Sequence, residues 1–151
     1  MWKLGVVVVV LLAAAAVYIS RCPCERVPGL WLLGDRVDAT VDDWSFANEV
    51  PLCQIEVRSW RPHSVNLNCM STGPDLYISC SRCAGKSWSS TVLQQPRGLI
   101  RMFDKVYPVR FERVLDPDEL DLAWRVRAEK LSREGARPDH WWSFRLTSAP
   151  G

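Results

Sequence analysis

Alternating apolar and polar positions predict three β-strands in the first half of the chain. The alternation runs through the stretches LCQIEVRSW, HSVNLNCM and DLYISC, which begin at residues 52, 63 and 75. A period of two is typical of strands that bury one face and expose the other. Residues 71–74, Ser-Thr-Gly-Pro, separate the second and third stretches and have the composition of a hairpin turn. We therefore expect three consecutive strands, the last two joined as a hairpin.

A second hairpin and a final strand are expected further along the chain. GLIRMF and VYPVRFERV flank Asp104 and Lys105, which form the predicted turn. Pro108 has no backbone N–H to donate, so it limits its strand to an edge of the sheet or to a bulge. Near the end, WWSFRLT alternates again and places Trp142, Phe144 and Leu146 on one inward face.

Two helices complete the predicted elements. Residues 87–95 form a short helix that ends before Pro96. A longer helix begins after Asp116, which is a favourable N-cap, has Pro117 at its first position, and extends toward Gly135. Its expected buried stripe comprises Leu120, Ala123, Trp124, Ala128 and Leu131. The order of strands and helices predicts an α+β fold built on a mostly antiparallel barrel.

The N-terminal segment is apolar enough to enter a membrane. Residues 4–19 carry no charge and would span about 24 Å as a helix, slightly less than a hydrocarbon core of about 30 Å. We expect residues 1–20 to be a retained transmembrane anchor. The alternative is a cleaved signal peptide, because Lys3 and the alanines at 13–15 fit a signal sequence. Residues 21–29 are interpreted as a linker and residues 30–151 as the folded domain.

Charge and cysteine content leave the side of the membrane open. Arg21 and Arg26 follow the apolar segment and Lys3 precedes it, which mildly favours a cytoplasmic domain. Six cysteines, two of them just beyond the membrane at positions 22 and 24, instead favour an exported, disulfide-bonded domain. The net charge of +2, with both signs interspersed, predicts no nucleic-acid partner.

The stretch CSRCAGKSW at residues 80–88 is open to more than one chemical interpretation. Cys80 and Cys83 form a C-x-x-C pair, although a zinc site would need two more ligands, and Cys53 and Cys69 fall on inward strand faces. Core filling or a structural disulfide is the simpler role. Gly85-Lys86-Ser87 matches the end of a nucleotide phosphate loop, but its first glycine is replaced by Cys80 and the predicted hairpins contradict a parallel sheet.

A third interpretation covers the run from residue 62 to residue 124. This run contains DLYISC, the Lys86-x-Trp88 turn, a short helix closing at Gln95 and Pro96, a hairpin, and the helix start DPDE. In these features it resembles the flavin-binding split-barrel superfamily, which includes pyridoxamine phosphate oxidases and deazaflavin-dependent nitroreductases. The resemblance implies a split barrel and a cofactor held between two subunits, and it covers about two thirds of the chain.

The resemblance also nominates residues that would hold FMN or a deazaflavin. Cations and hydroxyl groups hold a phosphate by charge-assisted hydrogen bonds. Where pyridoxamine phosphate oxidases carry an arginine and a lysine, this chain has His63 and Asn68, so phosphate capture would depend on Arg82 and Lys86. The cofactor-binding residues implied by position are His63, Ser64, Asn68, Ser79, Arg82, Lys86, Ser87 and Trp88.

These observations lead to a predicted function with two alternatives. We expect a membrane-tethered, flavin- or deazaflavin-dependent oxidoreductase that acts on a small organic molecule, as a homodimer or as a subunit of a membrane complex. No catalytic residue and no metal site are predicted, since the chain has only two histidines. The first alternative is a cofactor-free accessory or assembly subunit of a membrane complex. The second is a cysteine-based thiol or metal site.

Overall fold

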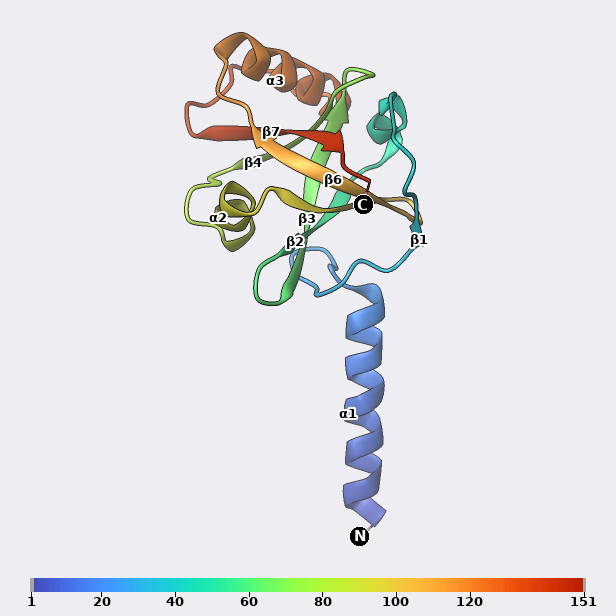
Figure 1. Cartoon of the computed structure of the whole chain (residues 1–151). Coiled ribbons are helices and arrows are strands. Elements are labelled where there is room, and N and C mark those ends of the chain that lie inside the picture. Colours follow the sequence, from blue (N-terminus) through green and yellow to red (C-terminus); the bar gives the residue numbers. More distant parts are fainter. Residues whose placement is uncertain (1, 151) are drawn as a thin grey trace.

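The computed structural model describes residues 2–150 as an N-terminal helix that projects from a barrel domain (Figure 1). Three α-helices, one short 3-10 helix and seven strands follow one another along the chain. In chain order the elements are α1 (Trp2–Arg21), β1 (Asp35–Arg36), η1 (Ser45–Glu49), β2 (Cys53–Arg58), β3 (Pro62–Ser71), β4 (Leu76–Ser81), α2 (Ser87–Gln94), β5 (Arg97–Met102), β6 (Lys105–Arg113), α3 (Pro117–Leu131) and β7 (Trp141–Ser148).

Six of these strands close into an antiparallel barrel. The strand order is β6-β5-β2-β3-β4-β7, and a further pairing of β7 with β6 completes the circle. The short strand β1 lies outside this circle and pairs with β6 in the parallel direction. The α+β split barrel with two helices and a preceding apolar helix, expected from the sequence, is therefore confirmed.

The barrel is split along one half of β3. Strand β4 pairs with β3 from Asn68 to Ser71, while β2 pairs with β3 from Pro62 to Leu67 on the opposite edge. Strand β4 thus leaves residues 62–67, the lower half of β3, unpaired on its own side. Gly29 fills part of that side, because Gly29 and Ser64 exchange two backbone hydrogen bonds of 2.9 and 3.0 Å.

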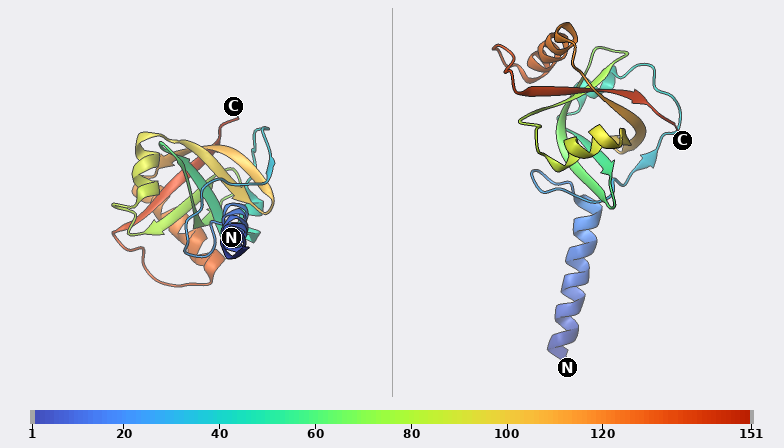
Figure 2. Two further views of the ribbon diagram at one scale, coloured as in Figure 1. Left: turned by 90° about the horizontal axis from the view of Figure 1, so that it is seen from below. Right: turned by 60° about the vertical axis from the view of Figure 1, so that its left-hand side comes forward.

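The alternation in the sequence matches the inside and outside of the barrel. Cys53, Ile55 and Val57 of β2 are fully buried in the central core. Trp142 packs against the same core from β7, beside Phe144 and Leu146, as expected. Helix α2 lies against the barrel (Figure 2), and its buried residues Trp88 and Val92 also belong to this core.

Helix α3 covers the outer face of β3, β4 and β7. Asp116 caps it as expected, since its carboxylate accepts a hydrogen bond from the Glu119 N–H at 2.9 Å. A second apolar cluster lies beneath this helix and comprises Met70, Tyr77, Val114, Ala123 and Trp141, with Leu120, Trp124 and Val126 packed against it. The predicted stripe is confirmed at Leu120, Ala123 and Trp124, whereas Ala128 and Leu131 are only partly buried and lie outside this cluster.

Pro108 is accommodated in a strand that is paired on both sides. Strand β6 pairs with β5 along one edge, and on the other edge with β1 at Lys105 and Val106 and with β7 from Val109 onward. Pro108 therefore lies between the two partners, where no ladder hydrogen bond requires its missing N–H. The expectation of an edge strand is wrong for β6 as a whole and correct for this one position.

Residues 22–32, which we call the strap, connect α1 to the barrel by folding back onto it. Gln54 donates to the Pro23 carbonyl at 2.9 Å, and Asn66 donates to the Glu25 carbonyl at 2.9 Å. At Gly29 a β-carbon would come within 2.5 Å of the Cys22 backbone, so this close approach requires glycine. The strap is thus packed against the barrel domain.

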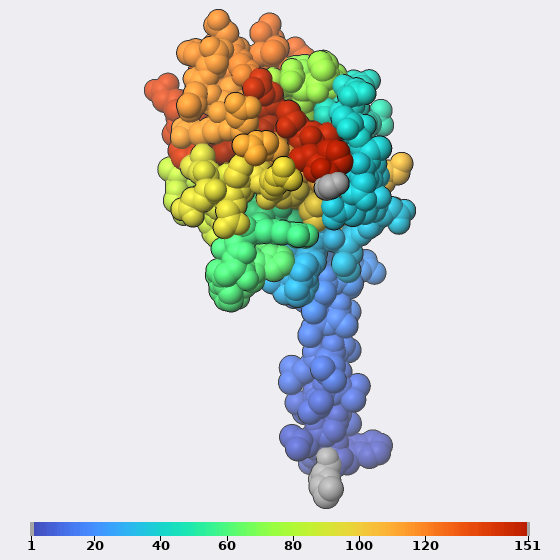
Figure 3. All heavy atoms as spheres, viewed as in Figure 1, coloured from blue at the N-terminus to red at the C-terminus, as the bar shows by residue number. Residues whose placement is uncertain are grey.

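Helix α1 is long and apolar enough to cross a membrane by length and composition, and a signal sequence would pass the same test. Its 20 residues correspond to about 30 Å, close to the thickness of a hydrocarbon core. None of these residues is buried against the domain, and the helix projects away from it (Figure 3).

Candidate functional site

Three of the eight nominated residues, Ser79, Arg82 and Lys86, lie near the end of β4 and in the turn that follows it. Asn68 pairs directly with Ser79 across β3 and β4, and both side chains are on the outer face, opposite the core residues Leu67 and Ile78. Ser79 is 2% exposed, and its hydroxyl has no hydrogen-bond partner within residues 2–150. The Ser79 hydroxyl is thus an unpaired polar group that is covered in this structure.

The turn after β4 places two cations at the surface. Arg82 has a left-handed backbone conformation with φ of 61°, and Gly85 follows with φ of 77°. Lys86 is the N-cap of α2, and its N–H donates to the Cys83 carbonyl at 3.1 Å. The Ser89 hydroxyl donates to the same carbonyl at 2.6 Å, which holds the turn against the helix. Arg82 and Lys86 are both exposed.

Lys86 and Trp88 border a pocket of about 280 Å³. The opposite walls are residues 65–67 of β3 and residues 25–28 of the strap. Arg26 and Glu25 therefore face the same space as Lys86. The pocket lies at the split of the barrel, beside the half of β3 that β4 leaves unpaired.

Trp88 is part of the core beneath the turn. It is 3% exposed, and its ring centroid is 5.5 Å from that of Phe144. Only a small edge of the indole is left to contact a ligand. Ser87, in contrast, is exposed at the first position of α2, where its carbonyl accepts a hydrogen bond from the Thr91 hydroxyl.

His63 and Ser64 lie at the opposite end of β3. Ser64 is fully buried beside Gly29, and its hydroxyl has no partner among the described residues. His63 is partly buried, and burial together with the positive charge of Arg61 lowers the pKa of its imidazole below the usual value. The structure therefore separates the eight nominated residues into a group around the turn and a group near the β2–β3 hairpin.

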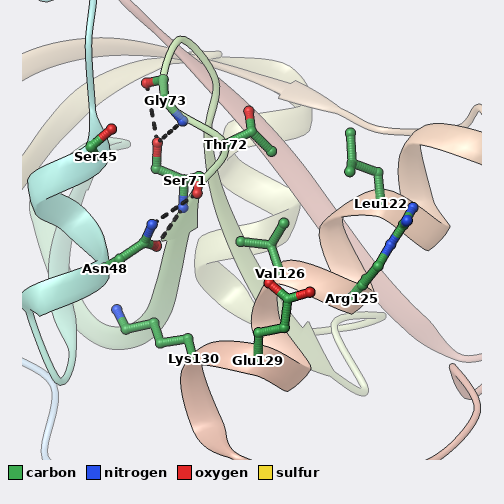
Figure 4. Close-up of a pocket in the computed structure, with 10 residues that line it drawn as sticks. All are labelled: Ser45, Asn48, Ser71, Thr72, Gly73, Leu122, Arg125, Val126, Glu129 and Lys130. Atoms are coloured by element: carbon green, nitrogen blue, oxygen red, sulfur yellow. Dashed lines mark hydrogen bonds between the residues drawn. The ribbon is translucent and has the colours of Figure 1, made fainter.

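A larger polar cavity of about 620 Å³ lies between η1, the β3–β4 hairpin and α3 (Figure 4). Asn48 and Ser71 form one wall, where the Ser71 N–H donates to the Asn48 carboxamide at 2.8 Å and the Asn48 amide donates back at 2.9 Å. Lys130 points toward this wall from α3, and Arg125 extends away from it.

Lys130 is a residue that the sequence did not single out. Its ammonium group donates to the carbonyls of Ala47, Val50 and Cys69 at 2.8, 2.5 and 2.6 Å. Burial lowers the pKa of Lys130 to about 8, so the group carries a proton at neutral pH. Because these contacts use its donors, Lys130 links α3 to η1 and β3 and is not free to bind a ligand in the cavity.

The cysteines form disulfides inside or close to the core. The pairs are Cys22–Cys24, Cys53–Cys69 and Cys80–Cys83. Cys80 and Cys83 are 8% and 0% exposed, so an exchanging thiol would have little access to either sulfur. Within residues 2–150, no cluster of three or more His, Cys, Asp or Glu side chains could hold a metal ion. The structural interpretation of the C-x-x-C pair is therefore favoured over thiol or metal chemistry.

Comparison with known proteins identifies the fold. No protein-family model and no curated protein sequence matches the chain. Solved structures match by shape. A pyridoxamine 5′-phosphate oxidase-like protein from Listeria innocua superimposes with a TM-score of 0.55 at 11% identity, over 68% of this chain and 87% of that one.

Two further structures extend the comparison. A protein assigned to 5-nitroimidazole antibiotic resistance from Bacteroides thetaiotaomicron gives a TM-score of 0.56 at 9% identity, over 73% and 82% of the two chains. A FAD-binding protein from Mesorhizobium loti gives 0.53 at 15% identity, over 74% and 92%. At these identities the matches establish a shared fold, the split barrel found among flavin-related proteins.

Proposed function

We propose that this protein binds the phosphate of a flavin or deazaflavin at the turn after β4 and is an oxidoreductase for a small organic molecule. The observation that carries the proposal is the position of Lys86. It borders a pocket against β3, the strand that supplies phosphate ligands in the proteins that this chain resembles. Helix α1 would tether the enzyme to a membrane.

The residues around the turn fit a phosphate group. Arg82 and Lys86 provide cations, Ser79 provides a buried hydroxyl without a partner, and Asn68 lies beside Ser79 on the same face. Charge-assisted hydrogen bonds from such groups are among the strongest in proteins. Ser87 adds an exposed hydroxyl at the start of α2.

Ser64 and Asn68 flank the pocket residues 65–67 on β3 and are too far apart to hold one phosphate together. Four residues of extended strand separate Ser64 from Asn68, which corresponds to about 13 Å. Ser64 is also sealed beneath Gly29. We therefore assign the phosphate to Asn68, Ser79, Arg82 and Lys86, and leave His63 and Ser64 outside the proposed site.

A second subunit would complete the site. The pocket of about 280 Å³ at Lys86 lies just below the range of roughly 300–1,000 Å³ that is typical of small-molecule sites. A homodimer whose partner closes over the outer face of the barrel would enlarge and enclose it. The bound ring would supply hydride transfer by its own electronics, while the chain binds and orients it and excludes water.

The test is a titration of the full chain in detergent with FMN and with a deazaflavin, followed by absorbance and fluorescence. We expect saturable binding that Lys86→Ala and Arg82→Ala each weaken about ten- to a hundredfold, since a hydrogen bond to a charged group contributes roughly 1.5–3 kcal/mol. Lys105→Ala, an exposed cation at the end of the β5–β6 turn, is the matched control and should bind like the parent. Absence of binding by folded protein would refute the proposal.

A second candidate function is a cofactor-free accessory subunit of a membrane complex. The observation in its favour is that the strap occupies part of the outer face of β2 and β3, where Gln54 and Asn66 hold it. This candidate predicts that neither cofactor binds and that the doubly substituted Lys86→Ala, Arg82→Ala chain still co-purifies with its membrane partner. Cofactor binding that depends on Lys86 would exclude it.

A further inference from the structure

The tip of the β2–β3 hairpin carries the most exposed aromatic side chain of the barrel domain. Trp60 is 84% exposed, although an indole ring is among the largest apolar groups in proteins. The guanidinium of Arg61 lies over this ring, 4.6 Å from its centroid. Arg58 is the last residue of β2 and is also exposed. An aromatic ring flanked by arginines therefore projects from this end of the barrel.

The hairpin tip projects from the same end of the barrel as α1 (Figure 1). In Figure 1 and in the right-hand view of Figure 2 the β2–β3 turn reaches the level at which α1 leaves the domain, and Figure 3 shows it as a projection next to the strap. Hydrogen bonds maintain this position. The Tyr18 hydroxyl of α1 donates to the Pro28 carbonyl at 2.6 Å, and Gly29 pairs with Ser64 near the start of β3.

The ends of α1 indicate where a membrane surface would lie. Trp2 and Tyr18 bracket the apolar stretch and are 85% and 38% exposed. Tryptophan and tyrosine are enriched at the level of the lipid headgroups. With Tyr18 and Arg21 at that level, the hairpin tip reaches the same layer.

Positive charge predominates around this layer. Arg21, Arg26, Arg58 and Arg61 surround it, and Glu25 is the exposed acidic residue among them. Glu56 lies nearby but is 1% exposed, and its carboxylate is occupied by the Leu32 N–H and by Arg58. Such a surface is complementary to a leaflet that contains anionic lipids.

We infer that the hairpin tip is a second membrane contact, in which Trp60 enters the headgroup region and Arg61 binds lipid phosphates of the leaflet that holds the end of α1. The helix and the hairpin together would fix the tilt of the barrel on the bilayer. This inference rests on the proposed membrane tether and not on the proposed cofactor, because Trp60 and Arg61 lie outside the pocket at Lys86.

The experiment places the full chain in nanodiscs of phosphatidylcholine, with and without phosphatidylglycerol, that carry a nitroxide quencher on the headgroup. Tryptophan emission is compared for the parent, Trp60→Phe and Trp124→Phe. Trp124 is the control because it lies on α3, at the far end of the domain from α1. Since Trp2 would also lie at an interface and Trp31 of the strap is 46% exposed, we expect Trp60→Phe to remove about a third of the lipid-quenched emission and Trp124→Phe to remove none of it.

Charge dependence sharpens the result. Arg61→Glu should reduce the quenching of Trp60 in nanodiscs with phosphatidylglycerol more than in those without it. Equal quenching of the parent and Trp60→Phe would overturn the inference. The inference would also be overturned if the chain dimerised in detergent and the second copy shielded Trp60. The hairpin would then be a protein interface.

Discussion

The outer face of the barrel has two coverings that differ in chemistry. Helix α3 covers one part with apolar side chains, placing Ala123 over Met70 and Tyr77 with Trp141 beside them. The strap covers another part mainly through polar contacts, in which Asn66 donates to a strap carbonyl and Glu56 accepts from a strap N–H. Leu32, at the end of the strap, adds an apolar contact with Leu99 and Val106. Both coverings lie over the outer face of the same barrel.

This difference in chemistry gives the two coverings different roles, one in the stability of the barrel and the other in its orientation. Apolar burial stabilises in proportion to the area removed from water and has little directional preference. A hydrogen bond adds only about 0.5–1.5 kcal/mol net but requires a defined geometry. We therefore expect the α3 covering to contribute mainly to the free energy of unfolding, and the strap to orient the barrel relative to α1.

The largest expected effect is at the apolar covering. Trp141 is 2% exposed and lies 5.2 Å from Trp124 in an edge-to-face arrangement, so Trp141→Ala should lower the free energy of unfolding by about 3–5 kcal/mol. Urea unfolding followed by circular dichroism measures it. Trp31→Ala, at a strap residue that is 46% exposed, is the control and should cost far less. Equal losses would contradict the division between the two coverings.

A smaller effect with a different signature is expected at the strap. Asn66→Ala removes the donor to the Glu25 carbonyl and should lower global stability by about 1 kcal/mol or less. Amide hydrogen exchange at Cys24 and Val27, which are bonded to each other, should nevertheless accelerate about tenfold, because local opening becomes easier. Asn48→Ala breaks two comparable bonds to Ser71 at the other end of the domain. If Asn48→Ala accelerated hydrogen exchange in the strap equally, the acceleration by Asn66→Ala would reflect global destabilisation and not local opening.

The smallest expected effect is a pH dependence of the free energy of unfolding that arises from His63, near the start of β3. The pKa of His63 in the folded protein is lowered from 6.5, mainly by burial. Below pH 6.5 the unfolded chain binds more protons than the folded one, so stability falls as the pH decreases. His63→Gln should therefore lose less stability than the parent between pH 7 and pH 5 in urea titrations. Identical slopes in the two proteins would argue against this contribution.

Local sequence patterns were sufficient for most of the fold. Alternation placed Cys53, Ile55 and Val57 inside the barrel, and the chemistry of Asp116 and Pro117 located the start of α3. These signals act within a few residues and do not require knowledge of the distant chain. The closure of β6 against β7 and the place of Pro108 between two partners emerged only from contacts between remote segments.

The candidate site was less accessible to sequence reasoning for the same reason. Lys130 resembles an ordinary basic residue in the last turn of a helix, yet it binds carbonyls of residues 61 to 83 positions earlier. The sequence predicts a linker at residues 21–29 because of their prolines and glycine. Gly29 nevertheless pairs with Ser64, and no local pattern signals that pairing.

The pairing of Gly29 with β3 also bears on self-association. The lower half of β3 would otherwise present unsatisfied N–H and C=O groups, which can template pairing with a strand of another molecule. The strap blocks that template at Ser64. A shortened chain beginning after Gly29 would expose it, so aggregation of such a fragment would reflect an uncovered edge and not an unstable barrel. A soluble version should begin at Cys22.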